Sequence, residues 1–119
     1  MFSALILRLA RWRVVGGLIG WLFARHSRWL PLRRLSETAT EIAFWHPRPS
    51  YPVHILIVPK QAVRALADLA PGEPNPAGGL VSTAAEIARS LGLSRYRLVL
   101  NGGAFQDVPQ LHVHLIVEP

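Results

Sequence analysis

The end of the chain alternates between apolar and polar side chains. Residues 111–117 read L-H-V-H-L-I-V, so apolar residues occupy every second position and two histidines stand between them. Because the side chains of a strand point alternately to its two faces, this pattern predicts a strand with one fully apolar face. Gln110, His112 and His114 would lie together on the opposite face.

Three earlier segments also have the composition of strands. Residues 41–45, 53–58 and 96–100 are short, mainly apolar runs rich in β-branched and aromatic residues. Residues 46–52 contain three prolines, which predicts an extended loop between the first two strands. Residues 30–34 are expected to form a linker into the domain.

Helical periodicity is confined to the middle of the chain. Apolar residues spaced by four, three and four positions predict one amphipathic helix that ends at Gly92, and they are Leu80, Ala84, Ile87 and Leu91. A shorter helix is predicted at residues 61–69, with Lys60 as its solvated start, followed by a Pro/Gly loop at 70–79. A turn is predicted at 101–103. Strands, helix and strands in this order indicate an α+β fold with a mainly antiparallel sheet.

Composition limits the class of protein. A chain of 119 residues that is 50% hydrophobic and 17% charged is long enough for one packed domain and is not a disordered polyelectrolyte. Cysteine is absent, which excludes disulfides, thiolate metal sites and a cysteine nucleophile. Seven of the thirteen basic residues precede Glu37, the first acidic residue, so the net charge of +6 belongs to the N-terminal segment.

Within this part of the chain, residues 1–29 differ in composition from all that follows. Its longest stretch without charge has eleven residues, 14–24, about half of the roughly 20 that a membrane-spanning helix needs. Three of the four tryptophans lie here among arginines, a mixture typical of the headgroup region. We therefore expect a helical anchor on an anionic membrane surface. The alternatives are a helix packed on the domain or on a second subunit, and a nucleic-acid-binding arm, which the apolar content disfavours.

The histidines are the candidate chemistry. His112 and His114, two positions apart on one strand, lie roughly 7 Å apart, close enough to flank one small anion. His54 alternates with apolar residues on another predicted strand, so the sheet can bring it beside them. Three interpretations fit this spacing: a solvated sheet face, a metal site completed by His54 or His46, and catalysis by imidazole near neutral pH. Spacing alone does not choose among them.

Three stretches of the chain resemble the histidine triad (HIT) family, in its branch of nucleoside phosphoramidases and nucleotide-binding proteins. Residues 43–60 are similar to the family's loop, P-x-H motif and apolar strand ending in P-K. Residues 91–101 are similar to its helix end and to the strand that delivers an asparagine. Residues 106–116, Q-D-V-P-Q-L-H-V-H-L-I, resemble its signature Q-S-V-x-H-φ-H-φ-H-φ-φ, where φ is apolar.

The resemblance implies roles for five polar residues. His112 would be the nucleophile that attacks the α-phosphorus of a nucleotide conjugate and forms a transient nucleotidyl-histidine. His114 and Asn101 would bind phosphate oxygens, His54 would lie beside the nucleophile, and Gln106 would face the phosphate or the leaving group. The family needs no metal or other cofactor for this chemistry.

The resemblance also implies a pocket for the base, and three positions in the expected site differ from the family pattern. Leu35 and Phe44 would line an apolar pocket for the base. Gln110 occupies the position of the first triad histidine and cannot supply a proton by ionising. Asp107 stands where the family has serine, and His46 stands where an acidic residue holds the ribose hydroxyls.

Taken together, the residues and the resemblance predict a HIT-like domain over residues 30–119, with about five antiparallel strands and two helices, and a helical extension over 1–29. The expected activity is hydrolysis or nucleotidyl transfer on a nucleoside 5′-phosphoramidate or similar conjugate. The alternative is a nucleotide-binding module with little or no turnover, held at a membrane surface. The expected partners are a purine nucleotide or its conjugate, a second copy of the chain in a homodimer and an anionic membrane, without nucleic acid. The expected location is the cytoplasm, in association with a membrane through residues 1–29.

Overall fold

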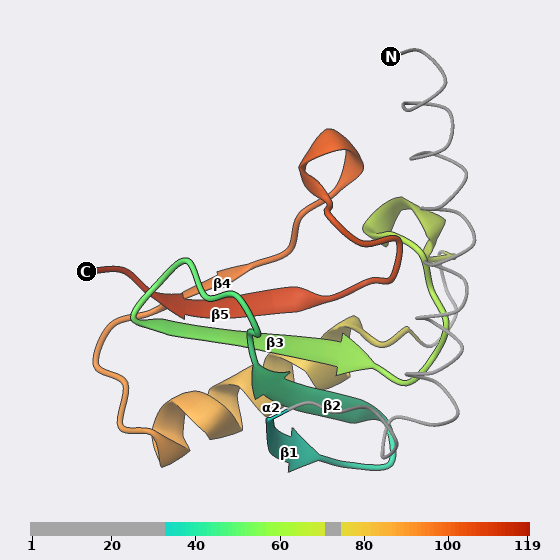
Figure 1. Cartoon of the computed structure of the whole chain (residues 1–119). Helices are drawn as coiled ribbons and strands as arrows, with labels where there is room; N and C mark the ends of the chain where they lie inside the picture. Colours follow the sequence, from blue (N-terminus) through green and yellow to red (C-terminus); the bar gives the residue numbers. More distant parts are fainter. Residues whose placement is uncertain (1–32, 71–74) are drawn as a thin grey trace, which may run out of the picture.

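Five strands form one antiparallel sheet in a computed structural model that describes residues 33–70 and 75–119 (Figure 1). The spatial order is β1-β2-β3-β5-β4, so β3 and β5 lie at the centre. The strands are β1 (Arg34–Glu37), β2 (Glu41–Trp45), β3 (Val53–Pro59), β4 (Arg97–Val99) and β5 (Val113–Val117). The predicted α+β class and the number of strands are confirmed.

Helix α2 (Ala77–Ser90) lies against β2 and β3 and covers one face of the sheet (Figure 1). Leu80, Ala84 and Ile87 are buried there, as their spacing predicts, in a core with side chains of β2, β3 and β5. Leu91 is 37% exposed, because the helix ends at this residue. The chain leaves the helix through Gly92, whose φ of 63° is readily adopted by glycine.

Two predicted elements differ from the structure. Residues 33–34 were expected in a linker, but Arg34 begins β1 and pairs with Phe44 of β2. The predicted helix at 61–69 is wrong, since it contains only one 3-10 turn, Leu66–Asp68. Its carbonyl groups are used by another part of the chain.

Those carbonyls bind residues that lead into β5. The Val63 carbonyl accepts the N–H of Leu111 at 2.7 Å, and the Gln61 carbonyl accepts the side-chain amide of Gln110 at 3.0 Å. The Arg64 carbonyl accepts the Gln106 amide at 2.6 Å. Long-range bonds therefore replace the i to i−4 bonds that a helix would need.

Cross-strand pairs of residues define the face of the sheet that points away from α2. Phe44 of β2 pairs with Leu56 of β3, and Leu56 pairs with His114 of β5. Phe44, Ile42 and Val58 form a second buried cluster, with Leu56 packed against it. His114 therefore stands in a cross-strand row with apolar neighbours rather than in open solvent.

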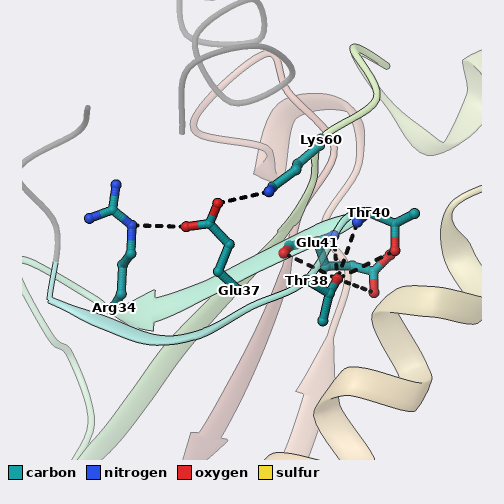
Figure 2. A network of polar contacts seen from close by, with 6 residues as sticks. All are labelled: Arg34, Glu37, Thr38, Thr40, Glu41 and Lys60. Atoms are coloured by element: carbon teal, nitrogen blue, oxygen red, sulfur yellow. Dashed lines mark hydrogen bonds and ion pairs between the residues drawn. The ribbon is translucent and has the colours of Figure 1, made fainter. Parts of the chain in front are cut away.

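An ion-pair bridge joins the two ends of β1 to the residue that follows β3. Figure 2 shows the Glu37 carboxylate between Arg34, at 3.1 Å, and Lys60, at 2.7 Å. Lys60 thus binds the last residue of β1 and does not begin a helix, contrary to the prediction. The pairs are partly exposed, so their contribution to stability is small.

A buried carboxylate lies nearby, between the sheet and the start of α2. Glu41 is 7% exposed, and its Oε1 accepts the hydroxyl of Thr83 from α2 at 3.1 Å. The backbone N–H of Glu41 is bound by Thr38 Oγ1 at 3.0 Å, within the network drawn in Figure 2. A Cβ atom added to Gly79 would meet Glu41 Oε2 at 2.6 Å. The glycine therefore allows the helix to approach this carboxylate.

The predicted N-terminal helical extension, residues 1–29, lies outside the described residues. Among the described helices, none is both long and apolar enough to cross a membrane.

Gly79→Ala should lower the free energy of unfolding by about 1–3 kcal/mol, because the new methyl group overpacks a carboxylate that Thr83 holds in place. The matched control is Gly78→Ala, whose Cβ would meet nothing within 4 Å. The control should be neutral or stabilising by up to about 1 kcal/mol. Urea unfolding followed by circular dichroism measures both, and equal effects of the two substitutions would contradict the packing described here.

Candidate active site

Four histidines from three parts of the sheet form one cluster. His54 lies on β3, His114 on β5, His112 directly before β5 and His46 directly after β2. His54 Nε2 and His114 Nδ1 are 2.9 Å apart, and the rings of His112 and His114 are 4.9 Å apart between centroids. His46 stacks on His54 at 4.2 Å with an interplanar angle of 25°. The sheet therefore brings together the three histidines that we predicted to be catalytic.

This face of the sheet is not solvated. His54, His112 and His114 are 6%, 9% and 8% exposed, so the interpretation as a solvated face is wrong. Beside His112 lies a cavity of about 280 Å³ with mainly apolar walls. The residues that line it are Phe44, His46, Pro47, Leu56, Val58, Val108, Gln110 and His112.

The protonation of His112 follows from one hydrogen bond. His112 Nδ1 lies 2.7 Å from the backbone carbonyl oxygen of Gln110. A carbonyl oxygen only accepts, so Nδ1 carries the proton and donates it. The Nε2 atom of the neutral ring then has a free lone pair, which is the form of imidazole that can act as a nucleophile.

A second chain of hydrogen bonds fixes His54 and His114. The backbone N–H of Ser50 donates to His54 Nδ1 at 3.1 Å, which puts the proton of a neutral His54 on Nε2. That proton is donated to His114 Nδ1, so His114 carries its own proton on Nε2. Among the described residues, His114 Nε2 is a buried atom without a hydrogen-bond partner. The cluster therefore holds a buried donor that requires an acceptor from elsewhere.

The electrostatics keep these rings neutral. Burial is the largest effect, and with the nearby rings of His112, His54 and His46 it lowers the pKa of His114 to about 4, against an opposing effect of Asp107. Burial also lowers the pKa of His54, with a further contribution from His46. The tautomers of His54 and His114 given above are therefore those present at pH 7.

Gln110 is part of the site wall, and its amide group is already bound. Its side-chain nitrogen donates to the carbonyls of Gln61 and Pro59, at 3.0 and 3.4 Å, and the residue is 3% exposed. It lines the cavity beside His112 without offering an ionisable proton.

The other predicted site residues divide into two groups. Phe44 and His46 line the cavity, and Asp107, which is exposed, lies close enough to oppose the lowered pKa values of His46 and His114. Gln106 binds the carbonyls of Arg64 and Val108 and lines a separate cavity of about 690 Å³.

The remaining two predicted site residues are Asn101 and Leu35. Asn101 is half-buried and follows β4, whose Val99 pairs with His114. Leu35 packs against the core beneath α2, so its predicted place in the base pocket is wrong. The reason is the register shift between Arg34 and Ser36, within which Leu35 stands.

The metal interpretation lacks geometric support. Within residues 33–70 and 75–119, no group of three His, Asp or Glu side chains has an arrangement that would hold a metal ion. The nitrogens of His54 and His114 that face each other are used in their mutual hydrogen bond.

Sequence reasoning missed two contributions to the site. Leu56 and Val58 line the cavity. They stand two and four positions after His54 on β3, so they share its face, and this spacing would have identified them. Ser50 acts through its backbone N–H, for which the sequence carries no signal beyond its place between prolines.

Comparison with known proteins gives consistent results along the chain. The family model described as the HIT domain matches residues 30–118. An uncharacterized 13.2 kDa HIT-like protein of Azospirillum brasilense is 36% identical over 100 residues, which cover 79% of this chain and 82% of that protein. The purine nucleoside phosphoramidase of Escherichia coli K12 is 34% identical over 80 residues, which cover 62% of this chain and 66% of that protein.

Solved structures agree with the sequence comparison. The crystal structure of a HIT family hydrolase from Legionella pneumophila superposes with a TM-score of 0.72 at 30% identity, and covers 81% of this chain and 90% of that chain. A family match over residues 30–118 and a relative that is 36% identical over 79% of this chain lead to one conclusion: the chain belongs to the HIT family.

Proposed function

We propose that this protein is a nucleotide hydrolase that cleaves a nucleoside 5′-phosphoramidate or a similar nucleotide conjugate, with His112 as the nucleophile. One observation carries the proposal. The bond from His112 Nδ1 to the Gln110 carbonyl leaves the Nε2 lone pair on a ring that lines the cavity. Relatives named purine nucleoside phosphoramidase and HIT family hydrolase support the reaction class.

The proposed reaction has two displacements at phosphorus. His112 Nε2 attacks the α-phosphorus, the bond to the leaving group breaks, and the leaving group takes a proton from water. Water then attacks the nucleotidyl-histidine, loses its proton to solvent, and releases the nucleoside monophosphate and free His112. While the phosphorus is bound to Nε2, the ring is cationic, and the bond from Nδ1–H to the carbonyl stabilises that charge.

The phosphate is bound by donors that the cluster already holds in place. His114 Nε2–H is buried without an acceptor among the described residues, and a phosphoryl oxygen would satisfy it. We assign Asn101 to a second phosphate contact, because β4 places it near β5. Gln106 lines the larger cavity, and we assign that space to the leaving group.

Substrate selectivity is assigned to the apolar wall of the smaller cavity. Phe44, Leu56 and Val58 present flat and branched apolar surface next to His112, which suits a purine base. His46 and Asp107 would face the sugar and the phosphate. The competing proposal is a module that binds a nucleotide and does not turn it over, since Gln110 cannot act as an acid.

We also propose two associations. A homodimer is supported by the edge strand β4, where Leu98 is 38% exposed and the adjacent Tyr96 is 53% exposed. Membrane association through residues 1–29 is supported by their Arg, Trp and aliphatic composition.

His112→Ala should lower the rate of AMP release from adenosine 5′-phosphoramidate by at least about a hundredfold, because no other group replaces the nucleophile. Glu86→Gln on exposed helix surface is the matched control and should retain the wild-type rate. Nucleotide binding by the wild type without turnover would instead favour the binding module.

Ser50→Pro should lower kcat/KM by about tenfold, because proline lacks the N–H that fixes the tautomer of His54 and, through it, that of His114. Ser50→Ala retains the N–H and should keep kcat/KM within about twofold of the wild type. Urea unfolding of both variants separates loss of fold from loss of the bond. His54→Phe, which removes the donated proton while keeping a ring, should reproduce the loss. Full activity in both Ser50→Pro and His54→Phe would contradict the chain of bonds.

The full-length protein should sediment with anionic phosphatidylserine vesicles and much less with neutral phosphatidylcholine vesicles, because arginines near the surface are attracted to anionic lipid. Replacing Arg8, Arg11 and Arg13 by Glu should return the protein to the supernatant. Equal sedimentation of both proteins with both kinds of vesicle would remove the electrostatic anchor.

A further inference from the structure

His46 is held rigidly at the cavity that contains His112. Its backbone N–H donates to the carbonyl of His54 at 2.9 Å, and its ring stacks on the ring of His54. The N–H of Arg48 donates to His46 Nδ1 at 2.9 Å. A neutral His46 therefore carries its proton on Nε2, just as His114 does.

His46 can therefore donate one more hydrogen bond but cannot accept another. Nδ1 is occupied, and Nε2 offers an N–H for which no acceptor is present among the described residues. A carboxylate at this place would accept hydrogen bonds from two ribose hydroxyls, whereas His46 has no acceptor left for them. The group that complements His46 is an acceptor, and the best acceptor on a nucleotide is a phosphate.

The surrounding charges favour an anion over a neutral acceptor. Arg48, whose backbone N–H binds His46, carries an exposed cationic side chain. Asp107 is the acidic group that acts on His46, and it is exposed to solvent. A phosphate that accepts from the neutral Nε2–H forms a charge-assisted bond, because the acceptor is ionised.

The distance to the first phosphate site fits a single ligand. The rings of His46 and His114 are 6.3 Å apart between centroids, and His46 and His112 both line the apolar cavity. A nucleotide with its base on that wall and its 5′-phosphorus at His112 would direct its ribose toward His46.

We propose that the substrate is a nucleoside 5′-phosphate conjugate with a second phosphate on the 2′ or 3′ position of its ribose, and that His46 Nε2–H binds this phosphate. The inference rests on the proposed function and deepens it by naming the substrate class. It assigns His46 as the residue that selects bisphosphorylated nucleosides.

Calorimetric titration of the full-length protein with AMP, adenosine 3′,5′-bisphosphate and adenosine 2′,5′-bisphosphate tests the proposal. One of the two bisphosphates should bind about tenfold more tightly than AMP, the size expected for one charge-assisted bond. AMP binding as tight as that of both bisphosphates would overturn the assignment of His46 and leave the proposed hydrolase intact. Absence of binding by all three nucleotides would overturn both.

Variants identify the residue responsible. His46→Phe retains a ring that can stack on His54 but removes the N–H, so the ratio of bisphosphate affinity to AMP affinity should fall to about one. His46→Asp should reverse the order, because its carboxylate accepts from the ribose hydroxyls and repels a phosphate. Asp107→Ser is the control for general electrostatics, and it should tighten binding of all three nucleotides without changing their order. A bisphosphate preference that survives in His46→Phe would contradict the proposal.

Discussion

The hydrogen bond between His54 Nε2 and His114 Nδ1, 2.9 Å long and buried, is the contact on which the site depends. It joins two neighbouring central strands, β3 and β5, whose pairing puts the two rings on the same face of the sheet. Because each neutral imidazole has one donor and one acceptor, the bond has a direction, and Ser50 sets that direction. The result is a donor at His114 Nε2 that points away from His54 and has no acceptor among the described residues. A buried donor without an acceptor lowers the stability of the free protein, and an anion that accepts its hydrogen bond removes this cost.

Burial also decides which chemistry the cluster can perform. With the pKa of His114 lowered to about 4, the ring is a neutral donor at pH 7 and not a cation. Between pH 6.5 and about 4, His114 binds fewer protons in the folded protein than in the unfolded chain. The free energy of unfolding therefore falls as the pH decreases through that interval. His112 is held in the complementary state, with its proton directed to a carbonyl and its lone pair free. A lone pair on His112 Nε2 beside a neutral donor at His114 suits attack on a phosphate group that brings its own negative charge.

The sequence predicted those parts of the protein that local pattern determines. Alternation correctly placed His54 and His114 on strands, with His112 directly before β5. Helical spacing placed Leu80, Ala84 and Ile87 in the core. Residues 61–69 were misassigned because their carbonyls bind Leu111, Gln106 and Gln110, a long-range competition that no local pattern reveals. Leu35 was misplaced by a register shift in β1, and burial of the histidine face could not be inferred from the polarity of its residues. The tautomers depend on backbone groups of Ser50, Arg48 and Gln110, so only the three-dimensional structure could supply them.

The protonation pattern of the cluster is the central claim, and long-range ¹H–¹⁵N correlation of the imidazole nitrogens at pH 7 measures it directly. The account predicts that His54 and His114 each carry their proton on Nε2, and that His112 carries its proton on Nδ1 with an unprotonated Nε2. A His114 protonated on Nδ1, or a His112 protonated on Nε2 alone, would contradict it, because the phosphate donor or the nucleophilic lone pair would then be missing.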